Sequence, residues 1–177
     1  MKKYEFTGET KEIRLLFRTA TLHRIRATVA FGIVEVGDLG GWIEKEENLS
    51  HEGKAWVCGD AEVWGNAKVW GNAKVWGNAK VCGDAKVCGD AKVFSASHVL
   101  VIGAIGSRND FTTFYRDKDN EITVKCGCFL GKIDRFLEKV TQTHGDSKYA
   151  LVYRAAVEVA KLQIDLSGEA PKDADEE

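Results

Sequence analysis

A stretch between residues 53 and 99 repeats itself every six residues. The commonest unit reads Gly, Asn or Asp, Ala, Lys, Val, and then Trp or Cys. An apolar repeat of six fits neither the 3.6-residue period of a helix nor a plain hairpin meander, and it is typical of a parallel β-helix built from hexapeptides. No other feature constrains the fold as strongly. The valines that mark the repeat are Val57, Val63, Val69, Val75, Val81, Val87, Val93 and Val99.

The residue types of the unit fit an extended chain that bends at regular intervals. Alternate residues of a strand face the same way, so Ala and Val point inward together while the Lys between them points to solvent. Gly followed by Asn or Asp suits a sharp corner, where a positive φ or a local side-chain hydrogen bond is favoured. Residues eighteen apart then lie in neighbouring layers, stacked at about 4.8 Å. We expect both ends of so short a stack to be covered.

The repeat resembles that of the hexapeptide-repeat family, whose left-handed β-helix uses three hexads for each triangular coil. The resemblance covers about a quarter of the chain. Upstream, the segments 22–27 (LHRIRA), 37–44 (GDLGGWIE) and 47–50 (ENLS) resemble the opening of uncharacterised hexapeptide-repeat proteins of bacteria and their phages. The C-terminal part is similar to a unit found in the same proteins. The resemblance implies a fold and supplies no substrate.

The expected fold class is mainly β: a short left-handed parallel β-helix with an irregular β cap before it and a small β-β-β-α-α domain after it. We place the N-terminal cap at residues 1–50, the hexapeptide repeat at 51–98 and the α+β domain at 99–167. Residues 168–177 contain the only proline and end in Asp-Ala-Asp-Glu-Glu, which predicts a disordered acidic tail.

Within the C-terminal domain, the apolar run 99–102 predicts a strand buried on both faces. Two β-rich runs, 111–116 and 121–129, are joined at a turn-forming Asp-Lys-Asp-Asn segment and predict a hairpin. Apolar residues at helical spacing after residue 133 predict one helix, which Gly145 ends. A second helix should run from about residue 148 to residue 166, and both should cover the small sheet.

Composition narrows the functional classes. A formal charge of −2 over 177 residues gives no general attraction to nucleic acid or to an anionic membrane. The chain opens without an apolar run of signal-peptide or membrane-spanning length, so we expect a cytoplasmic protein. Five cysteines in such a chain predict reduced thiols instead of a disulfide framework.

The strongest candidate binding residues follow the apolar strand of the C-terminal domain. Two glycines, Gly103 and Gly106, let main-chain N–H groups converge, and Ser107 and Arg108 could clamp an anion beside them. A tight turn with a solvated arginine explains the same residues. Neighbouring strands add positive charge and a hydroxyl, so the predicted anion-binding set is Gly106, Ser107, Arg108, Tyr115, Arg116 and Lys125.

We interpret the protein as a non-enzymatic binding or scaffold protein with no cofactor and no metal. Its partners would be an anionic small molecule or an acidic protein segment. The alternative enzyme is an acyltransferase, since broadly related hexapeptide-repeat enzymes use a histidine as general base, and His51 and His98 flank the repeat. A third alternative is a phage-type protein that sequesters a nucleotide ligand. The Cys126-Gly-Cys128 pair offers two thiolates where a closed zinc site needs four ligands, which favours core cysteines.

Self-association is a further expectation. Trp64, Trp70 and Trp76 are six residues apart, so they lie on three different faces and form no flat strip for stacking sugars or bases. Packing near the corners or against another subunit suits them better. Because the family commonly packs its coils about a three-fold axis, the resemblance implies a homo-oligomer, and specifically a trimer.

Overall fold

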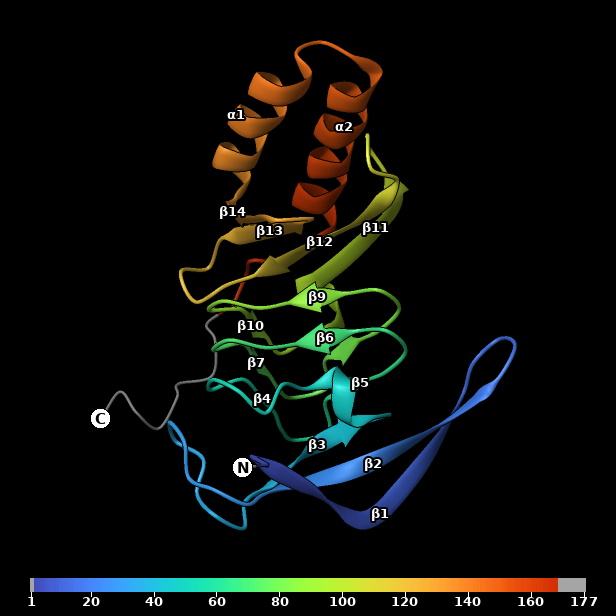
Figure 1. Cartoon of the computed structure of the whole chain (residues 1–177), viewed down its shortest axis with the longest axis vertical. Coiled ribbons are helices and arrows are strands. Elements are labelled where there is room, and N and C mark those ends of the chain that lie inside the picture. Colours follow the sequence, from blue (N-terminus) through green and yellow to red (C-terminus); the bar gives the residue numbers. More distant parts are fainter. Residues whose placement is uncertain (1, 169–177) are drawn as a thin grey trace.

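The computed structural model describes residues 2–168, so the predicted acidic tail lies outside the described residues except for Gly168. Figure 1 shows three parts along the long axis: an N-terminal hairpin at one end, the repeat in the middle, and a sheet covered by two helices at the other end. No helix within the described range is long and apolar enough to cross a membrane.

The N-terminal part is antiparallel β structure whose two strand pairs each contain a shift in register. Strand β1 (Tyr4–Arg14) pairs with β2 (Thr19–Ala27), and β2 pairs with β3 (Leu39–Ile43). Strand β3 contains two consecutive glycines, and at Gly41 there is no room for a side chain, because a Cβ there would lie 2.7 Å from the Ala61 carbonyl oxygen. Strand β3 can therefore lie directly against the first layer of the repeat and pair with it in parallel.

The hexads form a series of two-residue strands. These pair in parallel with the strand eighteen residues away, the spacing that the sequence predicts for neighbouring layers. Each corner holds a glycine with positive φ, which a residue with a Cβ rarely adopts. The strands are β4 (Trp56–Val57), β5 (Glu62–Val63), β6 (Lys68–Val69), β7 (Lys74–Val75), β8 (Lys80–Val81), β9 (Lys86–Val87) and β10 (Lys92–Val93).

These strands do not join into a closed β-helix, and the expected left-handed β-helix fold class is wrong. Among residues 2–168 the strands form four separate sheets, ordered β1-β2-β3-β5-β8, β10-β7-β4, β6-β9 and β11-β12-β13-β14. The physical reason is the length of the strands. Two paired residues are followed by a four-residue corner, so each paired strand is too short to join the next one in a continuous sheet, although main-chain hydrogen bonds between layers continue at the corners, as from the Asp60 N–H to the Gly77 carbonyl oxygen at 3.0 Å. The chain is mainly β, with small separate sheets and two C-terminal helices.

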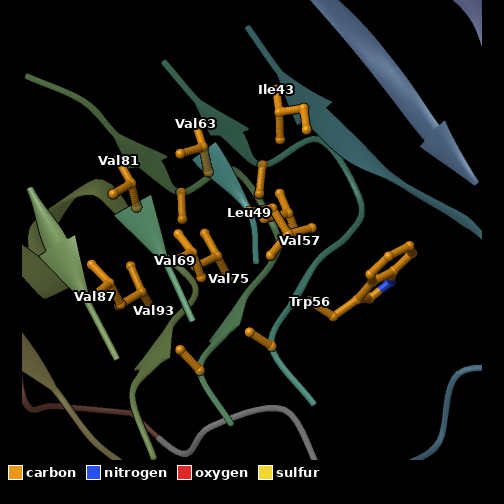
Figure 2. Packing of buried hydrophobic residues seen from close by; sticks show 14 of the residues in the cluster. Ile43, Leu49, Trp56, Val57, Val63, Val69, Val75, Val81, Val87 and Val93 are labelled. Carbon is orange, nitrogen blue, oxygen red and sulfur yellow. The ribbon is translucent and has the colours of Figure 1, made fainter. Parts of the chain in front are cut away.

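The three sheets that contain repeat strands share one apolar core, as the alternation of Ala and Val predicts. Figure 2 shows the valine side chains of successive layers stacked against one another inside the repeat. Each alanine and valine of the seven regular hexads is 0–1% exposed. Burying a valine fully is worth roughly 1.5–3 kcal/mol relative to exposing it, so most of the stability of this segment comes from the stacking of layers.

The C-terminal sheet has four antiparallel strands, where the sequence predicts three. They are β11 (Val99–Ile105), β12 (Asp110–Arg116), β13 (Ile122–Cys126) and β14 (Phe129–Lys132). The predicted strand 121–129 is divided at Gly127, whose φ of 54° turns the chain back on itself. As a result Cys126 packs against the helical core, whereas Cys128 is exposed, so the prediction of two core cysteines is wrong for Cys128.

Two helices, α1 (Ile133–His144) and α2 (Lys148–Gln163), cover the sheet as predicted. Strand β11 is packed on both faces, also as predicted: Val99 and Val101 contact the core of the repeat, and Leu100 and Ile102 contact the helical core. The sheet therefore separates two cores.

Short 3₁₀ helices and polar side chains cover the two ends of the repeat. The helix η1 (Glu46–Asn48) brings the buried Asn48 amide to the carbonyl oxygens of Gly65 and Ala67. At the other end, η2 (Ala96–His98) leads into β11, and the Lys86 N–H donates to the hydroxyl of Thr113 in β12. Both ends of the repeat are thus closed, as a short stack requires.

Candidate functional site

Two tight turns meet at one rim of the C-terminal sheet. The turn from β11 to β12 contains Gly106, Ser107 and Arg108, and the turn from β13 to β14 contains Gly127. A Cβ on Gly127 would lie 3.2 Å from Nη1 of Arg108, which places the guanidinium directly beside that turn. The structure therefore brings together residues that lie about twenty positions apart in the sequence.

Tyr153 of α2 packs against Gly106 at the same rim. A Cβ on Gly106, whose φ is 71°, would lie 2.0 Å from the Tyr153 hydroxyl oxygen, so only glycine leaves room for this ring. Burial raises the pKa of Tyr153, the neighbouring Cys126 thiol raises it further, and hydrogen bonding to Ser107 acts in the opposite direction. The hydroxyl is therefore un-ionised, and it is buried and already engaged with Ser107 and Cys126.

Two cations converge on the Gly127 turn. The ammonium of Lys125 donates to the Gly127 carbonyl oxygen, and the exposed Arg108 reaches the same turn from the other side. Within residues 2–168 no carboxylate pairs with either cation, whereas Arg18, Arg26 and Arg154 each have a carboxylate partner. The rim thus carries positive charge without an internal counter-ion.

The other two predicted members of the set lie elsewhere. Tyr115 is fully buried beneath the sheet, and its hydroxyl donates to the Cys88 carbonyl oxygen at 2.9 Å. Arg116 lies at the far end of β12 from the Arg108 turn. The sequence placed both beside Arg108 because they are near in the chain, but a seven-residue strand separates its two ends by about 20 Å. Of the predicted residues, Gly106, Ser107, Arg108 and Lys125 contribute to the rim.

Arg116 holds the end of the described chain against the repeat. Its guanidinium donates to the carbonyl oxygens of Ser167 at 3.0 Å and Gly168 at 2.5 Å, and it lies over the Phe94 ring at 4.8 Å. The side chain is 2% exposed, and these contacts offset only part of the cost of burying it, since its Nε is buried without a hydrogen-bond partner among the described residues. Arg116 is thus a structural clamp between β12 and the segment that follows α2.

His51 packs in the N-terminal part of the molecule. Its ring stacks on Tyr4 at 4.3 Å, its Nδ1 accepts the Lys3 N–H at 3.1 Å, and its Nε2 lies 3.8 Å from a carboxylate oxygen of Glu46. Burial lowers the pKa of His51 despite this carboxylate. The residue borders a hollow of about 470 Å³ that Lys68 and Trp70 also line, but both ring nitrogens are directed into the protein.

His98 is engaged in a similar way at the other end of the repeat. Its Nδ1 accepts the Phe94 N–H at 3.3 Å, and its Nε2 lies 3.4 Å from Nη1 of Arg116. Burial lowers the pKa of His98, and the neighbouring guanidinium lowers it further. A general base needs a ring nitrogen that reaches the proton it removes. In this structure neither predicted histidine offers such a nitrogen to a bound acceptor.

A carboxylate cluster between β12 and β13 was missed by sequence reasoning. Oxygens of Asp117, Asp119 and Glu121 lie within 4.8 Å of one another, close enough to hold a cation. The Lys132 ammonium already lies among them, at 2.5 Å from Asp117 and 2.6 Å from Glu121. Burial alone would lower the pKa of Lys132, but these ion pairs raise it to about 12. The acidic spacing in 117–121 is a signal that could have identified the cluster, but its partner Lys132 could not be identified without the fold.

Comparison with protein-family models gives no match for this chain, and comparison with curated proteins gives none either. The functional argument therefore depends on the geometry of the rim itself.

Proposed function

We propose that the protein is a non-enzymatic binding protein that holds an anionic group at the rim formed by Gly106, Ser107, Arg108, Lys125 and Gly127. One observation carries the proposal: Arg108 and Lys125 converge on one turn with no carboxylate partner in the described chain. Uncompensated cations at neighbouring tight turns are the usual means of binding phosphate and carboxylate groups.

The chemistry of the rim favours an oxyanion over other ligands. The guanidinium and ammonium groups supply charge, and the hydroxyl of the exposed Ser107 can donate a hydrogen bond. An anionic small molecule such as a nucleotide or a sugar phosphate suits these donors. The proposal assumes a cytoplasmic setting, in which the five cysteines would remain reduced.

Isothermal titration against inorganic phosphate, nucleotides, cyclic nucleotides and sugar phosphates tests this proposal, after a thermal-shift screen has selected ligands. We expect Arg108→Ala to weaken the binding of a selected ligand by about tenfold to a hundredfold, because a charge-assisted hydrogen bond contributes about 1.5–3 kcal/mol. Lys125→Ala should weaken it as well. The matched control is Arg135→Ala, which removes an exposed arginine of α1 in the same domain and should leave binding unchanged.

Two results would contradict the proposal. One is a wild-type protein that binds no member of the panel. The other is a ligand that binds wild type and Arg108→Ala equally well, which would leave Arg108 as a solvated turn residue.

A further inference from the structure

One face of the repeat carries a groove that the regular hexads do not form by themselves. Strands β6 and β9 form its floor, side by side in the middle of the molecule (Figure 1). A hollow of about 500 Å³ lies over this face, and a second hollow of about 470 Å³ adjoins it, because Glu47 and Lys68 line both. We call the two hollows together the β6–β9 groove.

Segments outside the hexads close the ends of this groove. One end is formed by η1, which contributes Glu47, and the other by the start of β12, which contributes Asp110 and Phe111. The floor between them is low, because the Ala67 side chain is a single buried methyl group. Each hollow falls within the usual size range of small-molecule sites. The groove therefore suits a ligand of two or more linked rings.

The charged groups of the larger hollow balance one another. It is lined by three carboxylates and three ammonium groups, namely Glu47, Asp84, Asp110, Lys45, Lys68 and Lys86. An anionic ligand would meet the carboxylates, and a cationic ligand would meet the ammonium groups, so neither is favoured. A neutral ligand whose groups both donate and accept hydrogen bonds can use both kinds of side chain.

Several of these groups keep the capacity to bond a ligand. Lys68 is exposed and forms no ion pair among residues 2–168. One oxygen of Asp84 accepts the Asn66 amide at 3.2 Å, and the other oxygen accepts no hydrogen bond from the described residues. The ammonium of Lys86 and the carboxylate of Asp110 lie 4.0 Å apart, which is too far for a hydrogen bond between them.

Each hollow also contains one aromatic ring. Phe111 lines the larger hollow and Trp70 lines the smaller one, and both side chains are partly exposed. Trp56 and Trp76 pack against other rings of the protein, whereas within residues 2–168 neither Trp70 nor Phe111 does so. Their rings offer apolar surfaces against which the C–H groups of a ligand can pack.

The neighbouring face of the repeat lacks this aromatic character. It has the same hexad residues and a hollow of about 420 Å³, in which Asn72 donates to Asp90 at 3.1 Å, as Asn66 does to Asp84. No aromatic residue of the described chain lines that hollow. The two rings therefore distinguish the β6–β9 groove from a face that is otherwise built alike.

We propose that the β6–β9 groove binds a neutral oligosaccharide. Sugar hydroxyls both donate and accept hydrogen bonds, which matches the equal numbers of carboxylates and ammonium groups. The C–H faces of two sugar rings match the two aromatic rings. A nucleotide could stack on the same rings, but its phosphate would meet the carboxylates. The inference goes beyond anion binding, because no residue of the anion-binding rim lines either hollow.

Saturation-transfer difference NMR tests the proposal, since it detects the weak binding expected where each hydrogen bond replaces one to water. The probes are maltotriose, cellotriose, lactose, mannotriose and N,N′-diacetylchitobiose, with a trimer of galacturonic acid as the acidic comparison. We expect saturation transfer from the protein to at least one neutral sugar, and little to the acidic trimer.

The repeat supplies a matched pair of variants for locating the bound sugar. Asparagine already occupies the Asp84 position in the hexads that contain Asn66, Asn72 and Asn78, so Asp84→Asn and Asp90→Asn should both fold. We expect Asp84→Asn to weaken binding of the selected sugar by about tenfold, because it removes a charged acceptor. Asp90→Asn, at the equivalent position of the neighbouring face, should leave binding unchanged.

A second pair of variants tests the aromatic contact. Trp70→Ala should weaken binding of the same sugar by about fivefold to tenfold. The matched control is Trp64→Ala, which removes an indole that follows β5 and lines neither hollow, so binding should be unchanged. Circular dichroism checks that all four variants are folded.

Three results would overturn the proposal. The first is a wild-type protein that transfers saturation to none of the neutral sugars. The second is an equal loss of binding in Asp84→Asn and Asp90→Asn, or in Trp70→Ala and Trp64→Ala, because the sugar would then lie elsewhere. The third is a preference for the acidic trimer, which would show that the site selects an anion.

Discussion

The repeat segment and the C-terminal sheet meet face to face, yet they bury different kinds of side chain. The interior of the repeat holds alanine and valine in every layer, each almost completely buried. Strand β12, which lies on the last layer, buries Thr112, Thr113 and Arg116, and Asp117 follows directly after it. Each of these four side chains makes at least one hydrogen bond in the described chain, although the buried Nε of Arg116 has no partner there.

The apolar interior and the buried polar groups have different physical effects: the first stabilises the fold, and the second orients one part of it on the other. A uniform apolar interior stabilises every layer in the same way and gives no layer a distinct neighbour. Buried polar groups are costly unless their partners are in place. Thr113, which accepts the Lys86 N–H, and Arg116, which contacts His98, therefore help to fix how the C-terminal sheet lies on the repeat, whereas Thr112 and Asp117 bond within the C-terminal domain. In this protein the repeated part supplies stability, and the non-repeated part supplies position and the candidate site.

The largest expected effect tests the apolar interior of the repeat. Val75→Asp places a charge among side chains that can neither solvate it nor pair with it, and we expect a loss of several kcal/mol that unfolds the repeat. The matched control is Lys68→Glu, an exposed position in the neighbouring strand β6, which should change stability by less than about 0.5 kcal/mol. Urea denaturation followed by circular dichroism measures both. Equal tolerance of the two changes would contradict the assignment of inward and outward faces.

A smaller effect compares corresponding glycines in the two regions. Gly83 and Gly106 both have positive φ, so alanine strains the backbone at either position. A Cβ on Gly83 meets nothing within 4 Å, whereas a Cβ on Gly106 would collide with the buried Tyr153 ring. We expect Gly83→Ala to cost about 1 kcal/mol and Gly106→Ala about 1–3 kcal/mol more, as overpacking usually does. Thermal denaturation that ranks them in the reverse order would show that Tyr153 moves aside readily.

The smallest expected effect is a pH dependence at the boundary between the regions. The pKa of His98 is lowered from its ordinary 6.5, so between the two values the unfolded chain binds more protons than the folded one. The contribution of His98 is therefore complete above pH 6.5 and decreases as the pH falls through the lower, folded-state value. His98→Asn retains an acceptor for the Phe94 N–H, and its melting temperature should fall less than that of the wild type between pH 7.5 and 5. Parallel curves would contradict this, since His51 contributes in the same direction to both proteins.

The sequence predicted most of what depends on repetition. Because Val57 and Val75 occupy the same place in hexads eighteen residues apart, their pairing follows from spacing alone, and it is observed. The spacing could not predict whether the paired strands join into one continuous sheet. The resemblance implied a closed β-helix, but the strands are two residues long and fall into separate small sheets.

The candidate site was less predictable, for a different reason. Arg108 and Lys125 were proposed from local charge, and the fold places both at the Gly127 turn. Arg116 was included because it is near in sequence, but its strand carries it to the far end of the sheet. Tyr153 was not foreseen, because its contact with Gly106 joins positions more than forty residues apart and has no local motif. Proximity along the chain is a poor guide once strands and helices intervene.

The pairing of residues eighteen apart also limits how the protein can change in length during evolution. An insertion of eighteen residues would add one rung to each ladder and lift the C-terminal domain by about 4.8 Å, with Thr113 still above the strand that begins at Lys86. An insertion of six residues would bring a strand of a different sheet beneath Thr113. The hydrogen bond that Thr113 now accepts from the repeat would then lose its partner. Descendants of this chain should therefore differ in steps of three hexads, and each step would set a new distance between the N-terminal hairpin and the rim.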